Sequence, residues 1–255
     1  MDNIFVNLDA SIIASTTVPL MFAAWGAGWW IAQRQIRAGS KPPMSKFDDA
    51  SLALLGLLLG FTFSMAIVKH DQRRLMVVAD SNAIGDFYTC ATLLKEPVRT
   101  RLQTVIRDYA QLRLDLARPG AGSSRLEREL PRMQSMQGQM TALVAQALQE
   151  GTPIAVSLTN TLNGVTSNHA ARLAAIRDRL PPSIIVLLFV SAMVSAMLVG
   201  REQGASGAVE IVGTASFIVM VSLAIYVTLD LNQPERGLIT VSLEPFEHLL
   251  ASMAR

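Results

Sequence analysis

Four long apolar stretches constrain this sequence more than any other feature. They comprise Ser11–Gln33, Ala50–Val68, Ser183–Gly200 and Gly207–Leu229. A helix needs about 20 residues to cross the hydrocarbon core of a bilayer, and each stretch has roughly that length. Glu210 is the only formal charge inside them, whereas a core helix of a soluble protein usually carries charge on one face. We therefore predict four transmembrane helices.

The composition supports this prediction. Charged residues make up 16% of the chain, against about 25% in soluble proteins. Asp2 and Asp9 precede the first stretch without any Lys or Arg, so the basic region of a signal peptide is missing and we expect an uncleaved span. Cys90 is the only cysteine, which excludes an intrachain disulfide.

The region between the second and third stretches is polar and helical. Its apolar residues recur at spacings of three and four, as in Leu102, Ile106 and Tyr109, and this period predicts amphipathic helices. We expect helices at about residues 75–94, 96–117, 125–149 and 154–179, and a short amphipathic helix at 245–253. Consecutive helices of this length favour an antiparallel bundle.

We therefore predict an all-α membrane protein in which two transmembrane hairpins flank an inserted antiparallel helical bundle. The short connections Lys41–Pro43 and Arg201–Ser206 close the two hairpins. The expected regions are a first hairpin (1–74), a polar helical domain (75–180), a second hairpin (181–230) and a C-terminal tail (231–255).

Small residues and aromatic residues mark two helix surfaces. Gly56, Gly60 and Ser64 follow one another at intervals of four, which predicts a face for close helix packing; a pore-lining face is the alternative. Near the end of the first span, three tryptophans precede Arg34 and Arg37. Indole rings and arginines of this kind settle at the headgroup level of a membrane.

The distribution of Lys and Arg bears on orientation. The segment before the first span has none, whereas the first short connection carries Arg34, Arg37, Lys41 and Lys46, and the second carries Arg201. Because positive short loops stay in the cytoplasm, we expect the polar domain outside the cytoplasm. A comparable number of cations flanks the polar domain, but the rule loses force next to long domains.

Signatures of catalysis are missing from the sequence. It contains no phosphate-binding glycine loop, zinc-binding helix pair or nucleophile elbow. His70, His169 and His248 have no partner at ligand spacing, and we expect them at the surface. We expect no enzyme, no cofactor, no metal and no nucleic-acid partner.

Basic residues gather where the polar domain meets the spans. They are Lys69, Arg73, Arg74, Arg172, Arg177 and Arg179. Copies of the chain around an axis would place such charges in a vestibule that attracts anions; anchoring to lipid headgroups is the alternative. The spans hold almost no ionisable residue at their centres, which favours a passive pore over a proton-coupled transporter.

The second span resembles that of bestrophin anion channels, through Leu55–Ser64 followed by the cations from Lys69 to Arg74. Over nearly the whole chain, the sequence resembles the bestrophin-like membrane protein family of bacteria. The residues that carry this resemblance are Asp80–Gly85, Leu180–Pro182, Asp230, Pro234, Gly237 and Glu244–Phe246.

This resemblance implies a homopentameric, chloride-type channel in the bacterial inner membrane, with the second span lining the pore. Ala53, Leu57 and Phe61 match the apolar neck. Bestrophins differ in keeping their helical domain in the cytoplasm, and Ala53 is small for a tight gate. The alternative is a non-catalytic sensor or scaffold whose helical domain binds a ligand or a partner protein.

Overall fold

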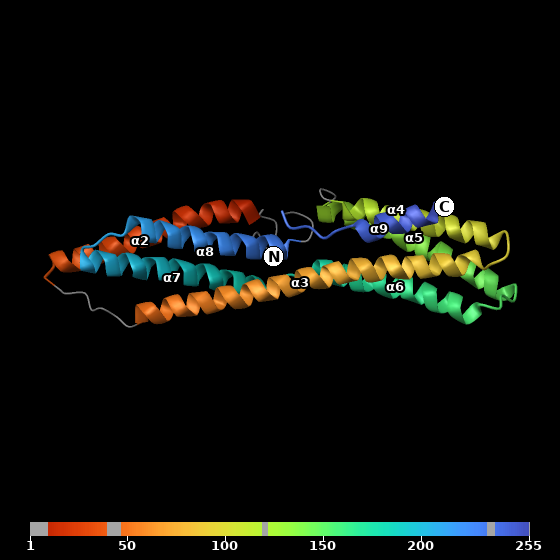
Figure 1. Cartoon of the computed structure of the whole chain (residues 1–255), viewed down its shortest axis with the longest axis horizontal. Helices are drawn as coiled ribbons and strands as arrows, with labels where there is room; N and C mark the ends of the chain where they lie inside the picture. The colour runs from red at the N-terminus through yellow and green to blue at the C-terminus, as the bar shows by residue number, and fades with distance from the viewer. Residues whose placement is uncertain (1–9, 40–46, 119–121, 234–237, 255) are drawn as a thin grey trace. The chain divides into compact units, whose positions relative to one another are not determined.

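The computed structural model describes residues 10–39, 47–118, 122–233 and 238–254, and the regular structure in these parts is helical (Figure 1). The helices are α2 (Ala10–Arg37), α3 (Phe47–Thr92), α4 (Val98–Ala117), α5 (Gly122–Gln149), α6 (Ala155–Arg177), α7 (Pro182–Ser206), α8 (Ile211–Asn232) and α9 (Glu244–Met253). The chain divides into two compact units. Unit 1 contains Met1–Val68 and Arg179–Gln233, and unit 2 contains Lys69–Asp178 and Pro234–Arg255.

Three helical stretches in the described part of the chain are long and apolar enough to cross a membrane. They lie within residues 48–92, 155–206 and 211–232, and they include the second and third expected spans and residues 211–229 of the fourth. The first expected span lies in α2, which is not among them. The all-helical prediction is confirmed, whereas the first expected span and the paired hairpins stay predictions.

In unit 1, α2 packs closely on α7 through glycines. A Cβ built on Gly28 would lie 1.9 Å from the carbonyl oxygen of Met197, and one on Gly200 would lie 1.9 Å from that of Trp25. A Cβ on Gly204 would meet the carbonyl oxygen of Trp29 at 2.8 Å. The two backbones therefore approach so closely that only glycine fits at these positions.

The remaining core of unit 1 is apolar. Met21 of α2 and Leu55 of α3 are buried together with Leu188, Ile218 and Ile225 from the last two helices of the unit. A side-chain hydrogen bond also joins α2 to α7 next to Gly204, because Trp25 Nε1 donates to Gln203 Oε1 at 3.2 Å.

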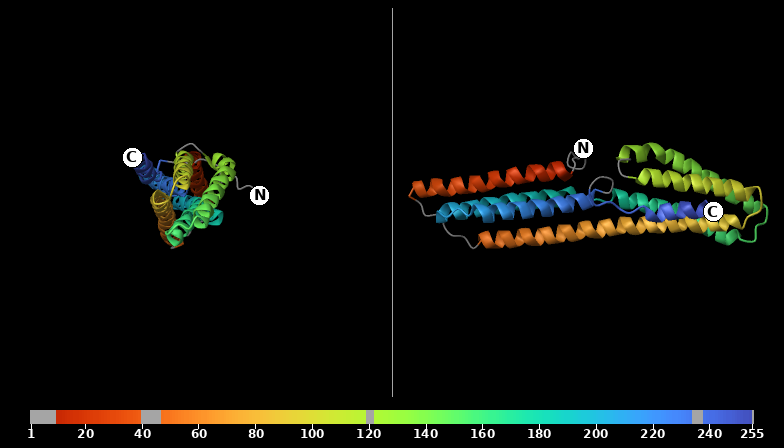
Figure 2. Two further views of the ribbon diagram at one scale, coloured as in Figure 1. Left: turned by 90° about the vertical axis from the view of Figure 1, so that its right-hand side faces the viewer. Right: turned by 45° about the horizontal axis from the view of Figure 1, so that its top comes forward.

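Unit 2 is a bundle built from the C-terminal half of α3 with α4, α5, α6 and α9 (Figure 2). Its core contains Phe87, Leu102, Tyr109, Met133, Met140, Leu158 and Phe246, one or two from each helix. The apolar period predicted for residues 125–149 is confirmed, since Met133, Met136, Met140 and Ala147 are buried; Leu143 is half-buried.

The division into units differs in detail from the four expected regions. It falls after Val68 and after Asp178, and it places residues 234–255 with the polar helices. The physical reason is α9, whose Phe246 and Met253 are buried in the core of unit 2. The predicted turn Lys41–Pro43, the loop residues 119–121 and the tail positions 234–237 lie outside the described residues.

Candidate pore face and buried charge cluster

One face of α3 is left uncovered within unit 1. Ala53, Leu57 and Phe61 recur every four residues and therefore share this face, and all three are exposed, Leu57 by 55% and Phe61 by 61%. The opposite face is buried through Leu55 and Thr62. Exposed apolar side chains of this size need lipid or another protein surface to cover them.

The small residues predicted to pack helices lie beside this row. Gly56, Gly60 and Ser64 are exposed, and a Cβ on either glycine would have no atom of the described residues within 4 Å. Their role in helix packing stays a prediction, and it would require a helix from another copy of the chain or from another protein. The glycines that bring helices together inside the chain are instead Gly28, Gly200 and Gly204, which the sequence analysis did not single out.

The predicted vestibule cations divide into engaged and exposed residues. Lys69 Nζ lies 2.5 Å from Asp178 Oδ1. Arg73 is buried and donates to the carbonyl oxygens of Ala175 and Asp178, where the last carbonyls of a helix need donors. Arg74 and Arg177 are exposed.

The other two predicted cations, Arg179 and Arg172, are not exposed. Arg179 is half-buried and lies in unit 1. Arg172 is buried in an ion pair with Asp80, so its charge is already compensated by a carboxylate inside unit 2.

That ion pair belongs to a buried charge cluster formed by Asp80, Arg113, His169 and Arg172. Asp80 is 0% exposed, and its Oδ2 accepts hydrogen bonds from Arg113 Nη2 and from Arg172 Nη1, the latter at 2.9 Å. Among the described residues, Oδ1 of Asp80 and Nε of Arg113 have no hydrogen-bond partner. Two guanidinium groups thus share one carboxylate in the buried interior of unit 2.

His169 completes the cluster in its neutral form. Its Nδ1 accepts a hydrogen bond from Arg113 Nη1, which requires that this nitrogen carry no proton. Burial first, and the adjacent charge of Arg113 second, lower the pKa of His169 to about 4. At neutral pH the imidazole is therefore uncharged. It accepts the hydrogen bond from Arg113 and adds no third positive charge to the cluster.

Two aromatic rings enclose the cluster. The Cζ of Arg172 lies 5.0 Å from the centroid of the Phe246 ring. The rings of Tyr109 and His169 pack edge to face, with their centroids 6.4 Å apart. Burial raises the pKa of Tyr109, whose hydroxyl accepts a hydrogen bond from Gln137 at 3.1 Å. These contacts join α4, α6 and α9 around the carboxylate of α3.

This cluster was not predicted from the sequence, and the predicted surface position of His169 is wrong, because His169 is buried. The available signal was periodicity. Leu158, Leu162 and Val165 are buried in α6 at spacings of four and three, and His169 and Arg172 continue the same series. A polar residue on the buried stripe of an amphipathic helix needs a buried partner.

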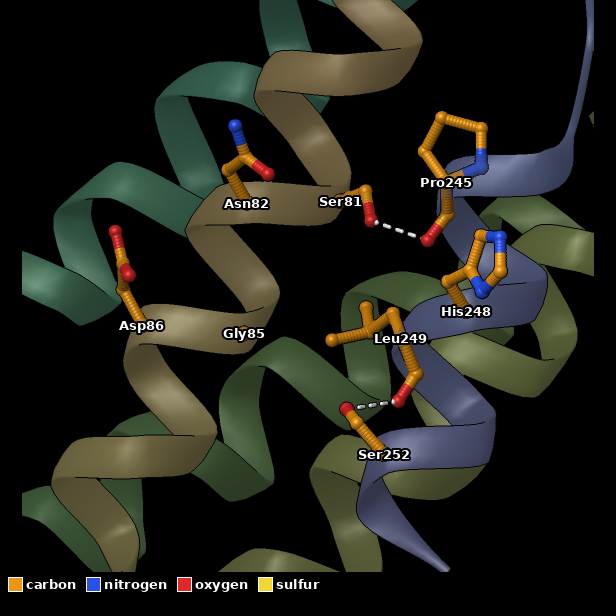
Figure 3. Close-up of a pocket in the computed structure, with 8 residues that line it drawn as sticks. All are labelled: Ser81, Asn82, Gly85, Asp86, Pro245, His248, Leu249 and Ser252. Carbon is orange, nitrogen blue, oxygen red and sulfur yellow. Dashed lines mark hydrogen bonds between the residues drawn. The ribbon is translucent and has the colours of Figure 1, made fainter.

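The C-terminal helix α9 docks beside the cluster and leaves a groove against α3 (Figure 3). Ser81 Oγ donates to the carbonyl oxygen of Pro245 at 2.9 Å. Arg107 Nη2 donates to the Met253 carbonyl at 2.7 Å. The groove has a volume of about 540 Å³, and its polar lining includes Asn82 and Asp86 from α3 and His248 and Ser252 from α9.

These features define an all-helical membrane protein with three apolar candidate spans and a polar helical unit. A family model for the Bestrophin-like domain matches residues 51–246. The chain belongs to the Bestrophin-like family, as its resemblance predicted.

Solved structures agree with this assignment. A mutant bacterial bestrophin homologue from Klebsiella pneumoniae superposes with a TM-score of 0.68 at 12% identity, over 93% of this chain and 95% of that one. A second structure of a Klebsiella pneumoniae homologue gives 0.66 at 13% identity, over 95% and 94%. A mutant membrane protein gives 0.67 at 13%, over 96% and 98%. At these identities the likeness concerns the fold. No curated protein matches the sequence.

Proposed function

We propose that this chain is the subunit of an oligomeric anion channel in which the exposed face of α3 lines the pore. The observation that carries the proposal is the uncovered row Ala53, Leu57 and Phe61, opposite a buried face on the same helix. Copies of the chain around an axis would turn this row into stacked apolar rings. Such rings form a hydrophobic constriction of the kind that gates channels.

Membership of the Bestrophin-like family supports this arrangement. The likeness to bacterial bestrophin homologues extends over more than nine-tenths of both chains, which supports the same layout of helices. On this basis we propose a homopentamer in the bacterial inner membrane.

The proposal includes α2 as a fourth span. Its 28 residues rise about 42 Å at 1.5 Å per residue, which exceeds the roughly 30 Å of a hydrocarbon core. It packs against α7, itself part of an apolar candidate span. A helix that shares such an interface along its length is expected to cross the bilayer with its neighbour.

Anion preference is proposed from the cations that remain exposed. Arg74 and Arg177 project from unit 2 near the two points where the chain passes from one unit to the other. Repeated around an axis, these charges would raise the local concentration of anions. Arg73 and Arg172 contribute less, because one bonds to helix carbonyls and the other to Asp80.

Conduction through reconstituted liposomes tests the proposal. We expect chloride flux from the purified chain, and we expect Phe61→Ala to increase it several-fold because the substitution widens an apolar ring. The matched control is Phe63→Ala, on the same helix two residues further on and turned about 200° away; Phe63 is also exposed. Absence of any flux, or equal effects of the two substitutions, would contradict the α3 pore.

A second candidate function is a membrane sensor or scaffold, which the groove between α3 and α9 favours. Exposed Asn82, Asp86 and His248 offer donors and acceptors to a ligand or a partner protein. Co-purification of a second membrane protein at fixed stoichiometry, from membranes in which the chain does not self-associate, would favour this function over a channel.

A further inference from the structure

The C-terminal end of α2 carries a pocket that the proposed pore does not use. It has a volume of about 250 Å³ and is lined by Trp29, Trp30, Gln33, Arg34 and Arg37. All five residues belong to the last turns of one helix, so the spacing of the helix itself places two guanidinium groups and two indole rings around the pocket.

The two arginines have no carboxylate partner in the part of the chain that the structure describes. Arg34 and Arg37 are both exposed. By contrast, Arg201 in the same unit is paired, with its Nη2 3.3 Å from Asp48 Oδ1. Two carbonyl oxygens at the end of α2 already accept backbone hydrogen bonds, because Ala38 N–H donates to the Arg34 carbonyl and Gly39 N–H donates to the Ile36 carbonyl. The guanidinium donors therefore remain available to an external anion.

The pocket also has a fixed geometry. The Cζ of Arg34 lies 5.3 Å from the centroid of the Trp30 ring, and a guanidinium stacked on an indole keeps its in-plane N–H donors free. Gln33 Nε2 donates to the carbonyl oxygen of Gly204 at 3.0 Å, which anchors one wall to α7. Paired N–H donors on a planar group match two oxygens of a phosphate.

The position of the pocket along α2 indicates which phosphate-bearing molecules can reach it. The residues that precede it in α2 are apolar or uncharged back to Ser11. Trp30 is 56% exposed, and exposed tryptophans at the end of an apolar helix lie at the headgroup level.

We propose that this pocket binds the phosphate group of an anionic phospholipid. The inference rests on α2 lying in the bilayer, as proposed above, and is independent of ion conduction. A soluble phosphate presents the same oxygens and is the competing source of the ligand.

Tryptophan fluorescence gives a direct readout, because all three tryptophans of the chain, Trp25, Trp29 and Trp30, lie in α2 near the pocket. The full chain is reconstituted into phosphatidylcholine bilayers. Increasing fractions of phosphatidylglycerol with brominated acyl chains are added, and quenching is compared with that by brominated phosphatidylcholine. We expect a preference for phosphatidylglycerol of roughly fivefold for each arginine that contacts the lipid.

The decisive variant is Arg34→Gln combined with Arg37→Gln, which should remove this preference. The matched control combines Arg101→Gln with Arg125→Gln, two exposed arginines of unit 2, and it changes the net charge equally. It should keep the preference. A preference that survives in the α2 variant, or that is missing from the natural sequence, would overturn the proposal.

Inorganic phosphate, added to the protein in pure phosphatidylcholine and in bilayers that contain brominated phosphatidylglycerol, separates the two sources. Millimolar phosphate that abolishes the lipid preference, with a fluorescence change that the α2 variant lacks, would support the phosphate site and assign it to a soluble ligand. The readout does not require ion flow. A protein that conducts no chloride can therefore still reveal the site, and a conducting protein can still lack it.

Discussion

At the residue scale, the cluster around Asp80 is a requirement for folding more than a source of stability. Bringing a carboxylate and two guanidinium groups out of water costs several kcal/mol per ion, which their attraction must offset. The structure offsets it with two hydrogen bonds to one oxygen, a neutral His169 and the ring of Phe246 over Arg172. The balance holds only while the carboxylate is present.

Asp80→Asn should therefore destabilise unit 2 strongly. The amide leaves Arg113 and Arg172 buried without a counter-ion, and breaking a buried pair in this way typically costs about 3–5 kcal/mol. Loss of helical circular dichroism with temperature or denaturant in detergent measures the change.

The control for this prediction is Asp86→Asn, a carboxylate on the same helix that is exposed. A surface substitution of this kind usually changes stability by less than about 0.5 kcal/mol. Equal stability of the two variants would mean that the buried cluster is not needed for the fold of unit 2.

At the element scale, the sequence predicts the helices well and their contacts poorly. Local periodicity and turn residues place the predicted helices at 125–149 and 154–179 within a few residues of α5 and α6, because both signals are encoded within each helix. The predicted bundle helix from Leu75 continues the second span as one helix, α3, as expected. The apolar and amphipathic patterns change there while the backbone stays helical.

Contacts between distant helices escaped prediction for a physical reason. Gly28 of α2 contacts α7 near Gly200, but nothing in the sequence of either helix identifies the helix that it packs against. Gly200 and Gly204 repeat the four-residue spacing of Gly56 and Gly60, so spacing alone does not tell which pair meets a helix of the same chain. Among the described residues, no atom lies within 4 Å of a Cβ built on Gly56 or Gly60. The same holds for His169, whose partners Arg113 and Tyr109 lie on another helix, α4.

Gly28→Ala should weaken the packing of α2 on α7. The added methyl would lie 1.9 Å from a backbone oxygen of α7, and backbone atoms cannot move aside as the end of a side chain can. Overpacking of this kind costs about 1–3 kcal/mol. We expect a lower thermal midpoint for the purified chain in detergent.

Gly26→Ala is the matched control, two residues away on the same helix with no atom within 4 Å of an added Cβ. Alanine favours a helix over glycine by about 1 kcal/mol, so this variant should be as stable as the natural sequence or slightly more so. A Gly28 variant as stable as the Gly26 variant would refute the close α2–α7 contact.

At the scale of the whole molecule, the side of the membrane that holds the polar unit decides which solution its groove and exposed arginines meet. The short connections between the expected spans carry Arg34, Arg37, Lys41, Lys46 and Arg201, whereas the segment before the first span carries no Lys or Arg. This bias predicts that the connections face the cytoplasm and that residues 75–180 lie outside it. The resemblance to bestrophins implies the opposite orientation.

Labelling of a single cysteine distinguishes the two orientations. Cys90→Ala removes the only cysteine, and Arg118→Cys then introduces one at an exposed site at the end of α4. If the loop charges determine the topology, a membrane-impermeant maleimide should label this cysteine in intact spheroplasts. Gly39→Cys, beside the first basic connection, is the reciprocal control and should react only after the membrane is permeabilised. The inverse pattern would place the polar unit in the cytoplasm, so that Arg74 and Arg177 would attract anions from that side.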